Sequence, residues 1–375
     1  MKKIFLTAIA ILTMASASVF GMYGVDSGWI DFLTHGNQFR ARMQQLGFTL
    51  GNDMIKGTFG FDNNTGFGGA YGGLLNDIDG THYSFVPSIS MGLGYTSSLI
   101  SVGVGYNATI GTGYKDNGKS YNPVAHTPVL VLNAMDNAFR MAIPIQVYVD
   151  NDNTGGTKKT LTAVSLDAQF RYYTGLDMLP QIRLYLRYGN ASSKEVAGGT
   201  TTKALEGESF GFDFRLYFGS MVEEVALQPF VKLVYNGALG YTGETRVEAV
   251  KFMQAYNANT WTSASYKATS KWDLALTPAL GLTANSDIVS LYVEPSLGLK
   301  IEQNGSDTDK KVKEVYSLGY AVYAEIYITP LKNLEWYFEA SIGNVGVVNN
   351  NDQVVAGKGL GFAGTTGITW YLPAL

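Results

Sequence analysis

The sequence predicts an all-β protein, a transmembrane antiparallel up-and-down β-barrel of about 14 strands with short periplasmic turns and long extracellular loops. Three observations predict this class. From residue 83 onward, apolar and polar residues alternate with a period of two in segment after segment. The connections between these segments are alternately short and long. Only 15 % of the residues are charged and 13 % are aromatic, which is typical of an outer surface that meets lipid and carries aromatic belts.

Residues 1–21 have the composition of a signal peptide. Lys2 and Lys3 form a positive start, residues 4–14 are an apolar core, and residues 15–17 are small enough for a cleavage site. The apolar core is shorter than the ~20 residues that a membrane-spanning helix needs, although an N-terminal anchor is the alternative. Because the chain has no cysteine, it forms no disulfide and takes no lipoprotein anchor. We therefore expect an exported chain.

Residues 22–50 leave two alternatives open before the barrel proper, which we place at residues 51–375. Phe39, Met43 and Leu46 recur at helical spacing, which predicts an amphipathic helix over 37–46 that lies in the periplasm or plugs the barrel. Alternatively, Phe39, Ala41 and Met43 form one face of a strand, and the barrel reaches about 16 strands.

The remaining chain divides into strands joined in pairs. We predict strands at 54–62, 83–95, 99–112, 127–134, 138–150, 160–174, 180–190, 207–219, 223–236, 270–284, 288–302, 315–329, 333–343 and 359–372. Tight turns fall near Ser97, Asp136, 176–179, 220–223, Ser286 and 331–333, and long polar loops at 111–122, 150–159, 190–208, 237–270, 304–313 and 344–358. A soluble β-sandwich is the alternative, but it would not sort its connections by length in this way.

The last strand carries an assembly signal. Gly367, Trp370 and Leu372 match the spacing of the terminal pattern that the barrel-assembly machinery binds, although a terminal Phe is absent because Pro373-Ala374-Leu375 follows. We therefore expect that machinery and outer-membrane lipid as partners.

Charged residues on the polar faces of the strands predict a lined pore. If those faces point inward, a basic arc lies on four consecutive strands and an acidic arc on a later run of three. The basic arc comprises Arg171, Arg183, Arg187, Arg215 and Lys232, and the acidic arc Glu294, Glu325, Glu335 and Glu339. A basic arc facing an acidic arc would set up a transverse field across water, as at a diffusion-pore constriction. The alternative is a closed interior filled by ion pairs, helped by Asp167, Asp213 and Lys300, or one plugged by residues 28–50 or 237–270.

Other chemistry finds little support in the sequence. The Gly359-x-Gly361-x-x-Gly364 pattern matches a dinucleotide fingerprint, but it lies inside the last predicted strand and not before a helix. The three histidines are not spaced as metal ligands. The formal net charge of −4 leaves no basic stripe for nucleic acid. We expect no cofactor, no metal and no enzymatic activity.

The segment Ser27–Met43 (SGWIDFLTHGNQFRARM), with Met22-Tyr23-Gly24 before it, Leu46-Gly47-Phe48 after it and Thr369-Trp370-Tyr371-Leu372 near the end, resembles the variable surface proteins of intestinal spirochaetes (Brachyspira). The resemblance implies an abundant, surface-exposed antigen of the outer membrane from a multi-copy family, with the long loops facing antibodies. It carries no catalytic residue.

The expected function is that of a surface-exposed barrel and major antigen with porin-like passive diffusion. The alternatives are a general diffusion porin as the primary role, or a dedicated transporter of lipid or hydrophobic solutes. Host antibodies or host surface molecules are the expected outside partners, and a homo-oligomer is compatible with the barrel.

Overall fold

A computed structural model describes residues 28–42, 45–63, 87–111, 114–116, 119–121, 123–154, 157–222, 225–239, 244–257, 271–303, 314–344 and 361–375. The predicted signal peptide, residues 1–21, and the predicted loop 304–313 lie outside the described residues. Within the described ranges, no helix combines the length and the apolar character needed to cross a membrane.

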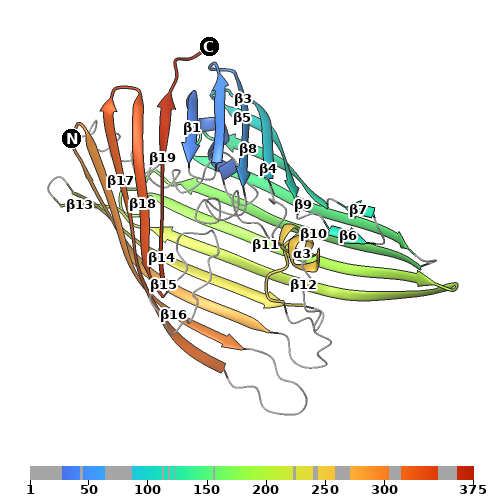
Figure 1. Cartoon of the computed structure of the whole chain (residues 1–375). Helices are drawn as coiled ribbons and strands as arrows, with labels where there is room; N and C mark the ends of the chain where they lie inside the picture. Colours follow the sequence, from blue (N-terminus) through green and yellow to red (C-terminus); the bar gives the residue numbers. More distant parts are fainter. Residues whose placement is uncertain are drawn as a thin grey trace.

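The chain forms a closed antiparallel barrel (Figure 1). Its strands are β1 (Gln38–Arg42), β2 (Gln45–Gly51), β3 (Ile55–Asn63), β4 (Pro87–Tyr95), β5 (Ile100–Ile110), β8 (Val124–Ala134), β9 (Phe139–Thr154), β10 (Thr157–Tyr173), β11 (Gln181–Ala197), β12 (Thr200–Tyr217), β14 (Val225–Ala238), β15 (Trp272–Asn285), β16 (Val289–Gln303), β17 (Glu314–Leu331), β18 (Leu334–Gly343) and β19 (Gly361–Tyr371). Three short strands accompany them: β6 (Tyr114–Asp116) and β7 (Lys119–Tyr121) pair with each other, and β13 (Ser220–Val222) pairs with β14. Over the described chain the ring therefore has 16 strands.

Pairing between the first and last strands closes the ring. Gln38 lies opposite Tyr371 and Arg42 opposite Gly367. Beyond the strands, the Leu372 N–H donates to the Asn37 carbonyl at 2.9 Å. The predicted assembly signal thus forms the seam: Gly367 and Trp370 pair with β1, and Trp370 is 54 % exposed on the outer face.

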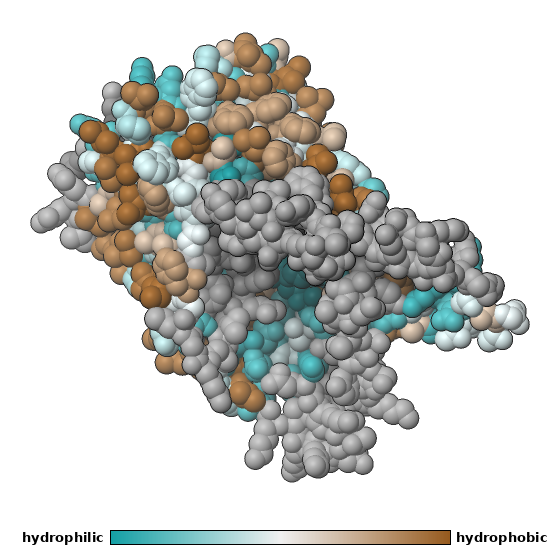
Figure 2. Space-filling view, in the orientation of Figure 1, coloured by the Kyte–Doolittle hydropathy of each residue, from teal (hydrophilic) through white to brown (hydrophobic). Residues whose placement is uncertain are grey.

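Each strand turns an apolar face outward and a polar face inward. On β8 the exposed positions alternate with buried ones, so Leu130 faces out while Thr127 and Asn133 face in. Figure 2 shows hydrophobic residues over the outer wall and hydrophilic residues in the interior that the opening reveals. This is the arrangement of a barrel whose outer face meets lipid.

The structure decides between the alternatives for residues 22–50 and corrects one of them. Residues 38–42 form β1 and residues 45–51 form β2, so the helix predicted over 37–46 is wrong and the larger strand number is correct. A plugging helix does exist, but it lies earlier, as the 3₁₀ helix η1 (Gly28–Thr34) inside the barrel. All fourteen predicted strands have a counterpart in the ring, and the parts of these predictions at 83–86, 112, 223–224, 270 and 359–360 lie outside the described residues.

Two predicted loops are in fact strand. Residues 150–154 and 157–159 belong to the β9–β10 ladder, and residues 190–197 and 200–208 belong to the β11–β12 ladder. The β11–β12 turn is made by Gly198 and Gly199, both with positive φ, as a two-residue hairpin turn requires. Because β12 pairs with β14 only from Ser209 onward, these hairpins extend past their neighbours, at the lower right of Figure 1.

Two short helices occupy the interior and form the apolar cores. One core joins η1 to Val129, Val131 and Ala142 on β8 and β9. The other joins helix α3 (Ala249–Asn257), from the predicted loop 237–270, to the wall at β8–β11. Interior apolar positions on these strands are therefore covered and not exposed to water.

A patch of four glycines on β4 and β5 makes room for η1. Gly92 lies opposite Gly105, and Gly94 opposite Gly103, all on the inner face. A Cβ on Gly92 would lie 2.7 Å from the Trp29 ring, and one on Gly105 would overlap the same ring. The missing side chains leave the hollow that the indole fills.

We predict that Gly105→Ala destabilises the folded barrel by about 1–3 kcal/mol, because overpacking forces Trp29 out of its hollow. Gly57→Ala on β3 is the matched control, since a Cβ there has its nearest neighbour at 3.9 Å. Denaturant unfolding of both variants in lipid vesicles, followed by fluorescence, measures the difference. Equal stability of the two variants would show that the glycine patch does not hold η1.

Candidate functional site: the barrel lumen

A buried carboxylate fixes η1 to the wall. Asp31 is 5 % exposed and lies 2.7 Å from the guanidinium of Arg140 on β9 and 2.7 Å from that of Arg171 on β10. At the C-terminal end of η1, the Lys56 ammonium on β3 donates to the carbonyl of Leu33 at 2.8 Å and to that of His35 at 2.6 Å. The segment is therefore held at its middle and at its C-terminal end by charges from three strands.

The charges around η1 also set the protonation states of Asp31 and His35. Burial alone would raise the pKa of the Asp31 carboxyl, but Arg171 and Arg140 outweigh burial and hold it well below its usual range. Burial lowers the pKa of the His35 imidazole to about 4, and Asp31 only partly offsets this effect. Docked η1 thus contains an ionised Asp31 and a neutral His35 near neutral pH.

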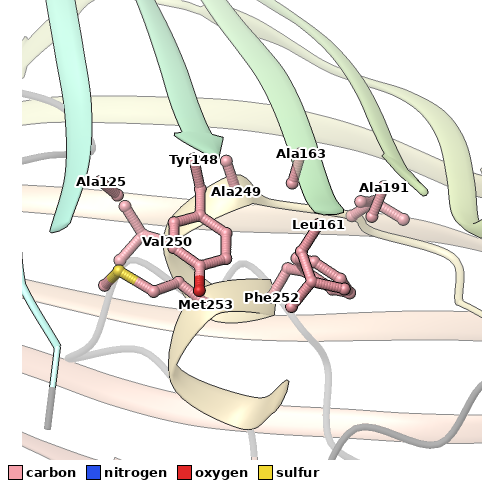
Figure 3. Packing of buried hydrophobic residues seen from close by; sticks show 10 residues of the cluster. Ala125, Tyr148, Leu161, Ala163, Ala191, Ala249, Val250, Phe252 and Met253 are labelled. Carbon is pink, nitrogen blue, oxygen red and sulfur yellow. The ribbon is translucent and has the colours of Figure 1, made fainter. Parts of the chain in front are cut away.

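Small residues on the wall form the seat of α3 (Figure 3). Ala125, Ala163 and Ala191 are fully buried and leave room for Phe252 and Met253. The Tyr148 and Phe252 rings meet edge to face with centroids 6.3 Å apart. Gly189 has no room for a side chain, because a Cβ there would overlap the carbonyl of Val247.

Wall side chains satisfy the backbone at the start of α3. The Ala249 N–H donates to Ser165 Oγ at 2.9 Å, and the Val250 N–H donates to Gln146 Oε1 at 3.2 Å. Just before the helix, the Val247 N–H donates to Ser209 Oγ at 2.7 Å. The first N–H groups of a helix lack partners within the helix, so the barrel wall acts as its cap.

A charged cluster lies beside this cap. Glu248 forms an ion pair with Arg246 at 2.5 Å and accepts a hydrogen bond from Lys251 at 2.9 Å. Burial alone would raise the pKa of the Glu248 carboxyl, but positive charges that include Arg187 outweigh it, so the pKa lies below its usual value. A cavity lies here between the segment and the wall, and the residues that line it include Asp167, Arg187, Asn236, Arg246 and Glu248.

The predicted basic residues all face the interior, on β10, β11, β12 and β14. Their partners differ. Arg171 lies under η1, and Arg187 lies in the cavity beside α3, 3.5 Å from Asp167. Arg183 stacks on Tyr217, 4.6 Å from its ring centre, and donates to Gln181. The remaining two, Arg215 and Lys232, share the carboxylate of Asp213 at 2.6 and 3.8 Å.

The predicted acidic residues face the interior on β16, β17 and β18 and mostly accept from tyrosines. Glu294 accepts from the Tyr292 hydroxyl at 2.5 Å, Glu325 from Tyr327 at 2.8 Å, and Glu335 from Tyr371 at 3.3 Å. Glu339 differs, because it forms an ion pair with Arg42 on β1. Phenol donors let these carboxylates stay inside the barrel without each having a cation.

The structure therefore places the predicted lining residues in two arcs, but the arcs do not face each other across the barrel. Strand pairing puts the basic arc on β10–β14 and the acidic arc on β16–β18, so that only β15 lies between them. The two arcs are neighbours on one wall.

Several residues of the site escaped the sequence analysis. Asp31, Arg140, Ser165, Gln146 and Glu248 hold the inserted segments, and nothing in their local pattern sets them apart from solvated residues. The glycines at 92, 94, 103 and 105 did carry a signal, because two glycines at period two on each strand of one hairpin leave a gap on a single face. Among the described residues, no group of three His, Asp or Glu side chains is arranged to hold a metal ion.

A closed barrel with an apolar outer face and a charged interior defines the class of outer-membrane β-barrels. Residues 2–371 match the family of Serpulina hyodysenteriae variable surface proteins, so the chain belongs to that family. No curated protein matches the chain.

Similar solved structures include OmpT, an outer membrane protein of Vibrio cholerae, at 10 % identity, with 90 % of this chain and 96 % of that chain covered and a TM-score of 0.36. Another is the transport unit of the autotransporter AIDA-I from Escherichia coli, at 11 % identity, with 76 % and 84 % covered and a TM-score of 0.29.

We predict that acid releases η1 from the wall. Docking lowers the pKa of His35 from 6.5 to about 4, so between these pH values His35 is protonated in the released segment and neutral in the docked one. Docking therefore weakens as the pH falls over this range. Asp31 adds to the loss only below about pH 4, where its carboxyl in the released segment becomes protonated.

Spin labels on Gly28→Cys and on Leu176→Cys measure this release as a distance distribution, and the cysteine-free background makes the labelling specific. We expect a narrow distribution of label-to-label distances at about pH 7 and a broad one at about pH 4.5. His35→Asn should remove the change in this range. An unaltered distribution in the parent protein would contradict the prediction.

Proposed function

We propose that this protein is a surface-displayed antigen whose barrel also conducts small solutes by passive diffusion, through a lumen narrowed by η1 and α3. The observation that carries the proposal is the combination of protruding hairpins at one end with an interior segment anchored in the lumen. Outer-membrane lipid and the barrel-assembly machinery are the proposed membrane partners, and host antibodies or surface molecules the outside ones. A homo-oligomer is compatible with this role.

The protruding parts of β9–β12 support the surface role. Their outer residues are polar and exposed, with Lys194, Glu195 and Lys203 near the β11–β12 turn. At the opposite end, the connections among the described residues include short turns such as 135–138 and 286–288. The long polar end is the one suited to contact molecules outside the cell.

The interior supports the diffusion role. A ring of 16 strands belongs to the size class whose lumen leaves an aqueous channel. The face of α3 that points away from the wall is polar, since the Lys251 side chain is 44 % exposed while Phe252 and Met253 are buried against the wall. A segment held in the lumen with a polar face toward the passage narrows a channel without filling it.

Transport of lipid or hydrophobic solutes is less well supported, because η1 and α3 cover the two larger apolar clusters of the described wall. We also propose that the protein is not an enzyme. The described interior carboxylates bind arginines, lysines and tyrosines and do not converge on a nucleophile.

The surface role predicts sided labelling. On intact cells, a membrane-impermeant maleimide should react with Lys203→Cys, which lies on the exposed outer part of β12. The matched control is Leu176→Cys, 61 % exposed in the turn after β10, which should react only after the outer membrane is permeabilised. Protection of Lys203→Cys in intact, expressing cells would overturn the surface assignment.

The diffusion role predicts discrete single-channel steps in a planar bilayer. In the Lys251→Cys variant, a bulky thiol reagent should then reduce the conductance of each step, because residue 251 lies on the open side of α3. The same reagent on Leu176→Cys should leave the conductance unchanged. A folded protein without steps would overturn the diffusion role, and steps insensitive at residue 251 would remove α3 from the passage.

A further inference from the structure

The β11–β12 hairpin and its neighbour β10 carry lysines on the face that continues the lipid-facing side of the wall. Lys194 on β11 lies six residues beyond the outward-facing Tyr188, and since side chains alternate along a strand, it points to the same side. Lys203 on β12 lies directly opposite Lys194. Lys158 on β10 lies opposite Val196, two residues further toward the turn. All three lysines are exposed, and we call them the outer lysine patch.

A β-bulge places Lys203 on this face. The register of the β11–β12 ladder shifts by one residue between Ala191 and Ser192, and Glu206 is the extra residue of β12. The Glu206 carboxylate accepts from the Ser193 hydroxyl at 2.5 Å. Because successive side chains point to opposite faces, one extra residue reverses the faces of the β12 residues between it and the turn. The bulge therefore turns Lys203 from the lumenal face to the outward one.

The shifted register brings two like charges together. If the register of the wall continued to the turn without the bulge, Lys203 would lie opposite the acidic Glu195. In the structure Lys203 lies opposite Lys194 instead, and like charges directly opposite each other destabilise a sheet. The hairpin therefore forgoes an ion pair and keeps a repulsion that an anion bound between the two ammonium groups would remove.

No described carboxylate neutralises the outer lysine patch. None of its lysines forms an ion pair with a described residue. On the outward faces of β10–β12, the described carboxylate nearest to the patch is that of Glu208, which accepts from the Tyr188 hydroxyl at 2.7 Å. Glu208 lies opposite Asn190, four residues from Lys194 and thus about 13 Å away along the strand. Exposed charges at that separation are largely screened at physiological salt, so the patch keeps its positive charge.

The patch lies just beyond the edge of the apolar band. Tyr188 and Phe210 lie opposite each other on the outward side and are exposed, as the aromatic residues of a membrane interface are. Asn190 and Glu208 form the first polar row beyond them. With the ~40° tilt of barrel strands, Lys194 stands about 10 Å above that row. Since the headgroup layer is about 5–8 Å thick and lysine stems are flexible, the ammonium groups can reach the headgroups.

We infer that the outer lysine patch binds the headgroup of an anionic lipid, one whose phosphate carries a net negative charge. A phosphate between Lys194 and Lys203 replaces their repulsion by two attractions, and Lys158 adds a third positive charge from β10. A lipid fits better than a soluble anion, because the patch continues the lipid-facing wall and does not lie at the hairpin tip. The site goes beyond the proposed surface role and rests on it only for the leaflet that supplies the lipid.

Native mass spectrometry of the folded protein tests the inference. In micelles that contain phosphatidylglycerol or phosphatidylcholine with the same acyl chains, we expect the parent protein to retain more phosphatidylglycerol. Lys194→Gln and Lys203→Gln should each weaken phosphatidylglycerol binding about fivefold, the effect of one lysine at an anionic membrane surface. Lys159→Gln is the matched control, because it removes the same charge from the lumenal face of the same sheet, opposite Glu195, and should leave binding unchanged.

Hydrogen exchange gives a second measurement that depends on the repulsion itself. In the parent protein, phosphatidylglycerol should slow amide exchange in the β11–β12 hairpin relative to phosphatidylcholine, because the anion removes the force that separates Lys194 from Lys203. In Lys203→Gln this difference between the two lipids should disappear.

The outcomes separate the inference from the surface role. Equal retention of both lipids by the parent protein would overturn the inference, and this comparison needs no variant. Retention of phosphatidylglycerol that survives the loss of both Lys194 and Lys203 would also overturn it, as would binding of soluble heparin by a patch that ignores phosphatidylglycerol. Lipid binding in micelles does not depend on which side of the membrane the hairpin occupies, so failure of the maleimide experiment would leave the site intact.

Discussion

The requirement that every strand be paired on both sides governs this structure. Lipid offers no hydrogen-bond partners, so a spanning sheet must close on itself. The closing pair, β1 with β19, has one of the shortest ladders in the ring, from Gln38 opposite Tyr371 to Arg42 opposite Gly367. Side chains reinforce it: Arg42 reaches Glu339 on β18, and Asn37 donates to the carbonyls of Gly51 and Pro373 at 2.9 and 2.7 Å. The position of β1 in turn fixes where η1, which directly precedes it, enters the barrel.

Closure at this size creates an interior that wall side chains alone do not fill. On β8 and β9 some inward positions are apolar, and Val131 and Ala142 would contact water if the lumen were simply open. The two inserted segments remove that contact, each with one apolar cluster and one set of polar anchors. The anchors decide orientation, because the apolar patches would accept a helix in several rotations, whereas Asp31 between two arginines and the capped N–H groups of α3 accept one. Apolar burial thus supplies much of the binding energy, and buried charges supply the specificity.

Strand-by-strand alternation predicted the barrel, its inward faces and all fourteen segments from 54 onward, because a period of two is a local signal. The alternation pattern failed where contacts with distant parts of the chain decide the local structure. The spacing of Phe39, Met43 and Leu46 fits a helix, yet closure of the ring required strands there. Residues 150–159 and 190–208 look like loops because both of their faces are polar, which is what a hairpin beyond the membrane needs. The partner of Arg171, Asp31, lies far away in sequence, so this arginine looked like a free pore charge.

The arginines of the interior differ in what they bind, and this difference bears on which parts of the chain can vary. Arg140 and Arg171 bind Asp31 of η1, whereas Arg187 binds Asp167 and lines the cavity beside α3. None of these residues lies near the β11–β12 turn, so that hairpin can change at its turn without altering them. Residues 247–253, between β14 and β15, have no such freedom, because Val247 and Ala249 are hydrogen-bonded to the wall and any change that frees them uncovers Ala163 and Ala191. A family that varies its surface on this scaffold should thus vary the hairpins first and keep the residues that hold α3.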